Sequence, residues 1–259
     1  MKNVQSITKG VIPAAGLGKR FWPVTKIIPK ELLPIVTKPS IHMVLEEANH
    51  SGLKDIVLIV ALAKKSFFDH LHDFFPQMNF HFVEQREPFG LGHAVGLAEK
   101  KVEEEPFVVL LPDVIIDHET TVTQQLIQNF QTIQKSVCAA ERVPKEKVHL
   151  YGVYDIASSE GKLHKAKGVI EKPNAEKAPS DLGVAGRYLF TPDIFPLLTD
   201  TKPGYGGEIQ LADAMNILAK REALYAYEFE GRHFDIGHPQ GFIQAIDYYG
   251  KKEYGNGLD

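Results

Sequence analysis

The chain has 259 residues, with 29 basic and 33 acidic side chains and a formal net charge of −4. Apolar residues make up 44% and charged residues 24%, values that are ordinary for a globular protein and exclude a collagen, a coiled coil or a disordered chain. The slight acidity argues against a protein that binds nucleic acid by neutralising phosphates. The single cysteine, Cys138, excludes an internal disulfide and a cysteine metal cluster.

No apolar run in the sequence reaches the roughly 18 residues that a membrane helix needs. The N-terminal residues also lack the apolar core of a secretory signal peptide. We therefore expect a cytoplasmic protein with no membrane partner.

The first half of the chain alternates short apolar runs with amphipathic stretches. Strands are expected at residues 7–12, 55–60, 79–83 and 107–111, and helices at 39–51, 66–74 and 92–100. This alternation predicts an α/β fold with a mixed, mostly parallel central sheet and helices on both faces. Two of the runs, 56–60 and 107–111, are continuously apolar, which is typical of central strands.

The second half has shorter expected strands and fewer helices. Strands are expected at 137–143, 151–156, 168–171, 184–190 and 223–229, and helices at 208–220 and 239–249. No repeat or Pro/Gly-rich linker separates the halves, so we expect a single domain over 1–259. Its two halves divide at about residue 135, and the polar stretch 251–259 is expected to be a loose tail.

A glycine-rich segment, Val11-Ile-Pro-Ala-Ala-Gly-Leu-Gly-Lys-Arg20, follows the first expected strand. Gly16 and Gly18 let the backbone approach a ligand closely and present N–H groups to a phosphate. The segment is not a Walker loop, because Pro13 stands where the first glycine belongs. It is not the dinucleotide fingerprint either, because Phe21 stands at the third glycine.

Cationic side chains follow at Arg20, Lys26 and Lys30. Three prolines restrict the same segment, which favours charges in fixed positions over a solvated basic loop. Arginine binds phosphate oxygens with a planar fork, whereas lysine supplies a point charge. The segment is therefore suited to a polyphosphate.

Two carboxylates follow expected strands that are far apart in the sequence. Asp113 ends Leu110-Leu-Pro-Asp113, and Asp235 lies in His233-Phe-Asp-Ile-Gly237. The carboxyl end of a central parallel strand is where such sheets bind ligands. Mg²⁺ prefers one or two carboxylates together with phosphate oxygens, so the pair is a candidate metal site. For Asp113, a structural turn residue is the alternative.

Two further motifs carry charged side chains. Gly168-Val-Ile-Glu-Lys-Pro173 places Glu171, a group that can accept hydrogen bonds from sugar hydroxyls, next to Lys172, which can bind a phosphate. Gly207-Glu-Ile-Gln-Leu-Ala-Asp213 is expected to begin a helix with Glu208 in its first turn, where a simple cap is the alternative. The histidines are scattered and no serine has the flanks of a hydrolase elbow, so neither a histidine metal site nor serine hydrolysis is expected.

Together these segments resemble the sugar-nucleotide pyrophosphorylases, most closely the bacterial members that act on UTP and glucose 1-phosphate. The resemblance is carried, in the family's order, by Ile12-Pro-Ala-Ala-Gly-Leu-Gly-Lys-Arg20, Pro29-Lys-Glu-Leu-Leu-Pro34, Gly90-Leu-Gly-His-Ala94, Leu110-Leu-Pro-Asp-Val114, Val169-Ile-Glu-Lys-Pro173, Gly186-Arg-Tyr188 and Gly207-Glu-Ile-Gln-Leu211. Each motif alone is weak, whereas the ordered series is specific. It implies a Rossmann-like nucleotidyltransferase domain with a nucleotide-binding first half and a sugar-phosphate-binding second half.

The resemblance also implies roles for individual residues. The nucleotide-binding residues are Ala14, Ala15, Gly16, Leu17, Gly18, Lys19, Gln85 and Gly90. The sugar-binding residues are Gly152, Glu171, Lys172 and Val184. The catalytic cations are Arg20, Lys30 and Lys172, and Asp113 and Asp235 hold Mg²⁺.

The implied reaction joins UTP and glucose 1-phosphate into UDP-glucose and pyrophosphate. The sugar phosphate attacks the α-phosphorus in line, with Mg²⁺ as cofactor, and no protein nucleophile is required. The alternatives are the same reaction with dTTP or another sugar 1-phosphate, and a non-catalytic protein that binds sugar nucleotides. Whether the protein is a homo-oligomer is left open.

Three features depart from the family pattern. Lys19 stands where the family usually has threonine, and Phe21-Trp22 is a bulkier pair than usual. The stretch from about residue 68 to 80 is shorter than in typical bacterial members.

Overall fold

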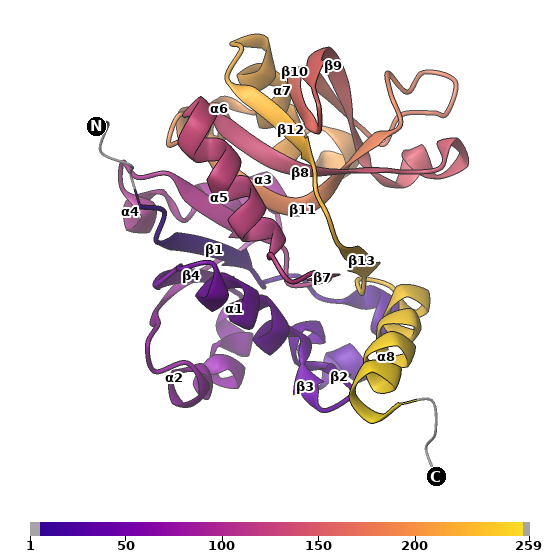
Figure 1. Ribbon diagram of the computed structural model, residues 1–259. Helices are drawn as coiled ribbons and strands as arrows, with labels where there is room; N and C mark the ends of the chain where they lie inside the picture. Colours follow the sequence, from indigo (N-terminus) through magenta and orange to yellow (C-terminus); the bar gives the residue numbers. More distant parts are fainter. Residues whose placement is uncertain (1–5, 256–259) are drawn as a thin grey trace.

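The computed structural model describes residues 6–255 (Figure 1). Its strands are β1 (Lys9–Pro13), β2 (Pro34–Ile35), β3 (Lys38–Pro39), β4 (Asp55–Val60), β5 (Asn79–Glu84), β6 (Phe107–Leu110), β7 (Val114–Asp117), β8 (Ser136–Arg142), β9 (Gly152–Glu160), β10 (Leu163–Glu171), β11 (Leu182–Phe190), β12 (Leu224–Glu228) and β13 (Arg232–Asp235). Its α-helices are α1 (Ser40–His50), α2 (Leu71–Phe74), α3 (Leu91–Gly96), α4 (Glu99–Val102), α5 (Val122–Ile133), α6 (Ile194–Asp200), α7 (Leu211–Lys220) and α8 (Pro239–Tyr254). Short 3₁₀ helices are η1 (Lys19–Phe21), η2 (Val24–Lys26), η3 (Lys30–Leu32), η4 (Leu62–Phe68), η5 (Lys145–Leu150) and η6 (Tyr205–Gly207).

In the described part of the chain, the main sheet has nine strands in the order β5-β4-β1-β6-β11-β8-β12-β10-β9. β5, β4, β1 and β6 are parallel neighbours, β8 and β12 are also parallel, and the other pairings in this sheet are antiparallel. Across the described sheet, seven strands therefore point one way and β10 and β11 point the other. The expected mixed, mostly parallel sheet is confirmed.

Alternate residues of the central strands face two separate hydrophobic layers. Val11 and Val109 pack with α3, α6 and α7, whereas Ile12 and Val108 pack with α1 and α5. Because side chains alternate along a strand, the continuously apolar runs are buried on both faces. The expected helices on both faces are confirmed. Because helices cover both faces of the sheet, the loops at the strand ends are the remaining place for a ligand.

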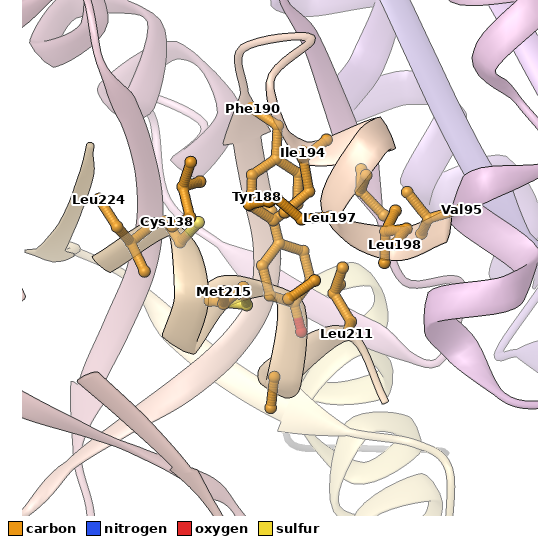
Figure 2. Packing of buried hydrophobic residues seen from close by; sticks show 14 of the residues in the cluster. Val95, Cys138, Tyr188, Phe190, Ile194, Leu197, Leu198, Leu211, Met215 and Leu224 are labelled. Atoms are coloured by element: carbon orange, nitrogen blue, oxygen red, sulfur yellow. The ribbon is translucent and has the colours of Figure 1, made fainter. Parts of the chain in front are cut away.

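In one of these layers, side chains of β11 pack against side chains of α6 and α7 (Figure 2). The rings of Tyr188 and Phe190 stack with their centroids 5.7 Å apart, and Leu198 of α6 and Met215 of α7 belong to the same cluster. Cys138 is fully buried there, as expected of a core strand, and burial raises the pKa of its thiol well above the usual value.

Several expected helices have other bounds, and the one expected at 92–100 is divided into α3 and α4. The region 66–74 forms η4 and α2 instead of one helix. His70 Nδ1 lies 2.9 Å from the carbonyl oxygen of Phe67, which a continuous helix would need for its own hydrogen bond. The helix expected at 208–220 begins at Leu211, so Glu208 precedes it. The backbone of Ile209 bonds instead to Phe89 and Gly92, which holds that segment extended.

Helix α8 runs through Tyr254, beyond the expected end at residue 249. Residues 251–254, expected to be loose, are therefore helical, and Lys252 Nζ bonds to Asp117 Oδ2 of β7 at 2.6 Å. Figure 1 shows α8, in yellow, beside β2 and β13 and away from the main sheet. The rest of the expected tail, 256–259, and residues 1–5 lie outside the described residues. None of the described helices is both long and apolar enough to cross a bilayer.

Candidate active site

A cleft lies at the carboxyl ends of the parallel strands. β1 ends at Pro13, β5 at Glu84 and β6 at Leu110, and the loop after each strand contributes to the cleft. The main cavity has a volume of about 530 Å³. It is lined by Pro13, Ala15, Gly16, Leu17, Gly18, Lys19, Lys30, Gln85, Pro88, Gly90, Leu91, Ala94, Leu111, Pro112, Asp113 and Glu208. Such a volume is in the range of small-molecule sites.

The glycine-rich loop is held against the segment that carries Lys30. Gly18 has a φ of +61°, and a side chain at this position would meet Lys30 and Thr25 at 3.2 Å. Thr25 Oγ1 donates to the carbonyl oxygen of Gly18 at 2.7 Å. Residues 15–19 line the cavity, whereas Ala14 lies below it, fully buried and with its N–H donating to a carbonyl of β4.

A lysine that the sequence analysis missed supports the same loop. Lys64 Nζ donates to the carbonyl oxygens of Gly16 at 2.5 Å and Ala14 at 3.3 Å, and it lies 3.3 Å from Glu31 Oε2. Burial raises the pKa of Glu31, and the attraction of Lys64 and Lys30 only partly offsets this. Among the described residues, Glu31 Oε1 is buried without a hydrogen-bond partner. The glycine-rich loop is therefore supported by the buried pair of Lys64 and Glu31, which no local sequence motif predicts.

Lys30 and Asp113 form an ion pair in the lining of the cavity. Lys30 Nζ donates to Asp113 Oδ2 at 2.5 Å. Burial acts to lower the pKa of Lys30, but the nearby carboxylates, led by Asp113, raise it overall. Burial acts to raise the pKa of Asp113, but Lys30, with a smaller effect of Arg20, lowers it overall. Both groups are therefore charged at neutral pH and available to phosphate or to a cation.

Asp113 and Asp235 converge on the backbone of Gly237. A side chain at Gly237 would meet Asp113 Oδ2 and Asp235 Oδ1, each at 3.0 Å, so the two carboxylates face the same small volume. Arg20 Nη1 donates to the carbonyl oxygen of Gly237 at 3.4 Å. Asp235 Oδ1 also accepts a hydrogen bond from the N–H of Gly237 at 2.9 Å. A pair of carboxylates is a ligand set that suits a hard divalent cation. No larger group of potential ligands from His, Cys, Asp and Glu gathers within residues 6–255.

The structure separates the expected cations. Lys19 and Lys30 line the cavity, whereas Arg20 does not and instead contacts the carbonyl oxygen of Gly237. Lys26 points elsewhere, with its ammonium 4.7 Å from the ring centroid of Trp22. The basic segment therefore divides into cations directed at the cleft and a cation held on an aromatic ring.

Gln85 and Gly90 lie together at the far end of the main cavity. Gln85 Nε2 donates to the carbonyl oxygen of Gly90 at 3.3 Å and lies 2.9 Å from His93 Nδ1, which fixes the orientation of the amide. Gly90 has a φ of +101°, and a side chain there would lie 2.7 Å from Glu208 Cβ. Glu208, expected in the first turn of a helix, instead packs against this glycine and lines the cavity.

A second cavity of about 200 Å³ adjoins the first, because Leu91 and Leu111 line both. All four expected sugar-binding residues line it: Gly152, Glu171, Lys172 and Val184. Glu171 Oε1 lies 3.0 Å from Lys172 Nζ. Tyr151, Tyr188 and Gln210 also line this cavity but were not predicted from the sequence. Their contribution depends on how β9, β11 and α7 come together.

The match to the nucleotidyl transferase family covers residues 9–252, nearly the whole chain. This protein therefore belongs to the nucleotidyl transferase family. UTP–glucose-1-phosphate uridylyltransferase of Bacillus subtilis is 40% identical to it over 263 residues, which cover 93% of this chain and 90% of the relative. The resemblance carried by the ordered motifs is confirmed.

Solved structures give the same result. A UDP-glucose pyrophosphorylase in complex with UDP-glucose is 40% identical and superposes with a TM-score of 0.90, covering 95% of this chain and all of the other. A UTP-bound UGPase from Acinetobacter baumannii is 34% identical, with a TM-score of 0.84 and 96% of each chain covered.

Proposed function

We propose that this protein is a UTP–glucose-1-phosphate uridylyltransferase, with UTP in the larger cavity and glucose 1-phosphate in the smaller one. The observation that carries the proposal is that the two cavities share Leu91 and Leu111 as lining residues. Leu111 is two residues before Asp113 in the chain. A nucleotide and a sugar phosphate placed there would meet beside Lys30 and the two carboxylates. The names of the relatives, at 40% identity, support the choice of substrates.

The proposed reaction is a direct substitution at the α-phosphorus of UTP. A phosphate oxygen of glucose 1-phosphate forms the new bond while the bond to the β-phosphate breaks, and pyrophosphate leaves with the electron pair. No side chain has to form a covalent bond, so the protein acts by positioning and by electrostatics. In this scheme Lys30 and Arg20 bind the triphosphate oxygens, and Lys172 directs the phosphate of the sugar.

Asp113 and Asp235 would hold Mg²⁺, which, when bound, neutralises phosphate charge and orients the phosphate oxygens. The pair fits this ion because two carboxylates face one small volume beside Gly237, although only Asp113 lines the main cavity. Lys30 bonds to Asp113, so a metal ion held by this carboxylate would lie next to the lysine. Both positive charges would then act on the same phosphates.

Glu171 is placed to recognise the sugar. A side chain at Gly152 would meet Glu171 Oε2 at 3.2 Å and Val184 Cγ2 at 3.3 Å, so glycine keeps this part of the small cavity open. A carboxylate accepts strong hydrogen bonds from vicinal hydroxyls. We infer that glucose occupies this space, with the substrates taken up from the cytoplasm.

The experiment that tests the proposal measures pyrophosphate release from a panel of nucleoside triphosphates and sugar 1-phosphates in the presence of Mg²⁺. The proposal expects the highest kcat/KM for UTP with glucose 1-phosphate, and UDP-glucose as the product. A higher kcat/KM with dTTP or with another sugar would reassign the substrates. Binding of UTP without turnover in any combination would instead favour a non-catalytic binding protein.

A further inference from the structure

Arg187 is a charged residue in the middle of a core strand, and the proposed reaction does not use it. It is 0% exposed, in β11, between the hydrophobic layers that fix that strand. It belongs to the motif Gly186-Arg-Tyr188, for which the sequence analysis assigned no role. Neither Arg187 nor its partner Glu47 lines the two cavities of the cleft; both line a separate cavity.

Arg187 binds the turn that carries Asp113. Its Nη1 donates to the carbonyl oxygen of Leu111 at 3.2 Å, and its Nη2 donates to that of Val114 at 2.8 Å. The N–H of Val114 also donates to the carbonyl oxygen of Leu111 at 3.2 Å, which closes residues 111–114 into a turn. The two carbonyls that Arg187 binds therefore flank Pro112 and Asp113 directly.

The backbone beside Arg187 is fitted to the same turn. Gly186 has a φ of +59°, and a side chain there would lie 2.6 Å from Val114 Cγ2. The N–H of Leu111 donates to the carbonyl oxygen of Gly186 at 3.0 Å. Strand β11 thus contacts both ends of the turn through its backbone as well as through the guanidinium.

Glu47 of α1 fixes the guanidinium. Arg187 Nε and Nη2 donate to its two carboxylate oxygens at 2.8 to 3.2 Å. The N–H and Oγ1 of Thr123, at the start of α5, donate to Glu47 Oε1 at 3.2 and 2.7 Å. Four elements are therefore tied to one another: α1, α5, β11 and the Asp113 turn.

A buried ion pair is a poor device for stability alone, since apolar residues of similar volume often stabilise a core at least as well. The planar fork of arginine instead offers several donors in fixed directions. Here the donors that do not bind Glu47 go to main-chain carbonyls, two of which flank Asp113. We propose that Arg187, held by Glu47, is the positioning residue that sets the carboxylate of Asp113 for metal and phosphate. This inference rests on the proposed function.

The test compares two kinds of variant. Arg187→Lys keeps the charge but loses the fork, and the double variant E47L/R187M fills the space with apolar groups and removes the bonds to the turn. Unfolding temperature reports the fold. Mn²⁺ titration of the enzyme–UTP complex by electron paramagnetic resonance reports the site without turnover, and UTP binding without metal serves as a reference.

We expect both variants to fold and to bind UTP without metal as the wild type does. Mn²⁺ affinity and kcat should each fall by about 10- to 100-fold, as is typical when a group that orients a ligand is lost. The KM for glucose 1-phosphate should stay within a few-fold. Wild-type Mn²⁺ affinity and kcat in a folded E47L/R187M protein would overturn the proposal.

Phe130→Leu is the matched control, because Phe130 is a buried apolar residue of α5 whose side chain has no donor for the turn carbonyls. It should lower the unfolding temperature and leave Mn²⁺ affinity unchanged. An equal loss of Mn²⁺ affinity in Phe130→Leu would assign Arg187 to general stability and overturn the proposal. If the wild type forms no UDP-glucose but Mn²⁺ binding is still weakened in Arg187→Lys, only the proposed function is rejected. The positioning role of Arg187 is then supported.

Discussion

The two sides of the cleft are built differently. On the side proposed to bind the nucleotide, loops after parallel strands bring residues from distant parts of the chain together, and Lys30 and Asp113 are 83 residues apart in sequence. On the side proposed to bind the sugar, Glu171 and Lys172 are neighbours at the end of β10, and their side chains lie 3.0 Å apart. The charged groups of the first side come from different elements, whereas the two charged groups of the second side, Glu171 and Lys172, are adjacent in the chain.

This difference predicts how each side responds to mutation. Changes on the nucleotide side should affect chemistry and metal binding, because its charged groups share partners. Changes on the sugar side should affect one substrate and leave the other alone.

The largest effect is expected for Asp113→Asn, with Asp235→Asn next. The amide keeps the size of the side chain but removes the charge, so kcat should fall roughly a thousandfold, in line with the several kcal/mol that metal-assisted charge stabilisation supplies. The measurement is kcat over a titration of Mg²⁺, with thermal unfolding as a check on the fold.

The matched control for this pair is Asp117→Asn, four residues along in β7. Asp117 bonds to Lys252 and Tyr248, outside both cavities, so its loss should leave kcat unchanged. Full activity without added metal in Asp113→Asn would contradict the proposed metal site. A loss in Asp113→Asn alone would leave a site with one carboxylate.

On the sugar side, Lys172→Ala should lower kcat/KM for glucose 1-phosphate by about 10- to 1,000-fold, the range expected when a charged contact to a reacting phosphate is removed. UTP binding, measured by calorimetry, should not change. Lys167→Ala is the control, because Lys167 is an exposed lysine of β10 paired with Asp155, and this variant should behave as the wild type. If UTP binding fell instead, Lys172 would belong to the nucleotide side.

A smaller effect is expected at the base. Gln85→Ala removes an amide that lines the cavity, so kcat/KM for UTP should fall about tenfold, in keeping with the loss of one or two hydrogen bonds. Discrimination against dTTP should change little, because uracil and thymine share a hydrogen-bonding edge. Arg86→Ala, with a side chain 83% exposed next to Gln85, is the control. Unchanged use of UTP by Gln85→Ala would remove this residue from the base site.

The comparison also shows what the sequence could and could not predict. The parallel strands of the first half were accessible, because continuously apolar runs between amphipathic segments indicate a sheet covered on both faces. Helix α5 was accessible too but was not predicted, although Thr121 and Gln124 form a capping box and Val122, Leu126 and Phe130 repeat at helical spacing. Its signal was local and complete.

Other features had no local signal. Lys64 and Arg187 act through carbonyl oxygens of loops that are 48 and 73 to 76 residues away. Their roles depend on which elements the fold places side by side, and neither residue type nor spacing indicates that. The backbone of Ile209 bonds to Phe89 and Gly92, and these bonds keep the segment around Glu208 extended. They are long-range too, so the sequence pattern alone predicted a helix there.

The smallest predicted effect lies outside both sides of the cleft, at the contact between α8 and β7. Burial acts to raise the pKa of Asp117, but hydrogen bonds from Lys252 and Tyr248 lower it overall. A carboxyl group whose folded-state pKa is lowered stabilises the fold above its unfolded pKa. This stabilisation is lost as the pH falls through the folded-state pKa.

Lys252→Ala should therefore lower the free energy of unfolding at pH 7 by at most about 1 kcal/mol, because the lysine is half exposed and solvent screens the pair. The difference from the wild type should shrink as the pH is lowered below the ordinary carboxyl range, where Asp117 is protonated in both proteins. Urea unfolding at several pH values measures this. Lys251→Ala, which breaks only an exposed pair with Asp247 on the same helix, is the control. Activity should be unchanged in both variants. A fall in kcat with Lys252→Ala would mean that a shift of α8 also displaces Asp235. The cleft would then depend on the contact between α8 and β7.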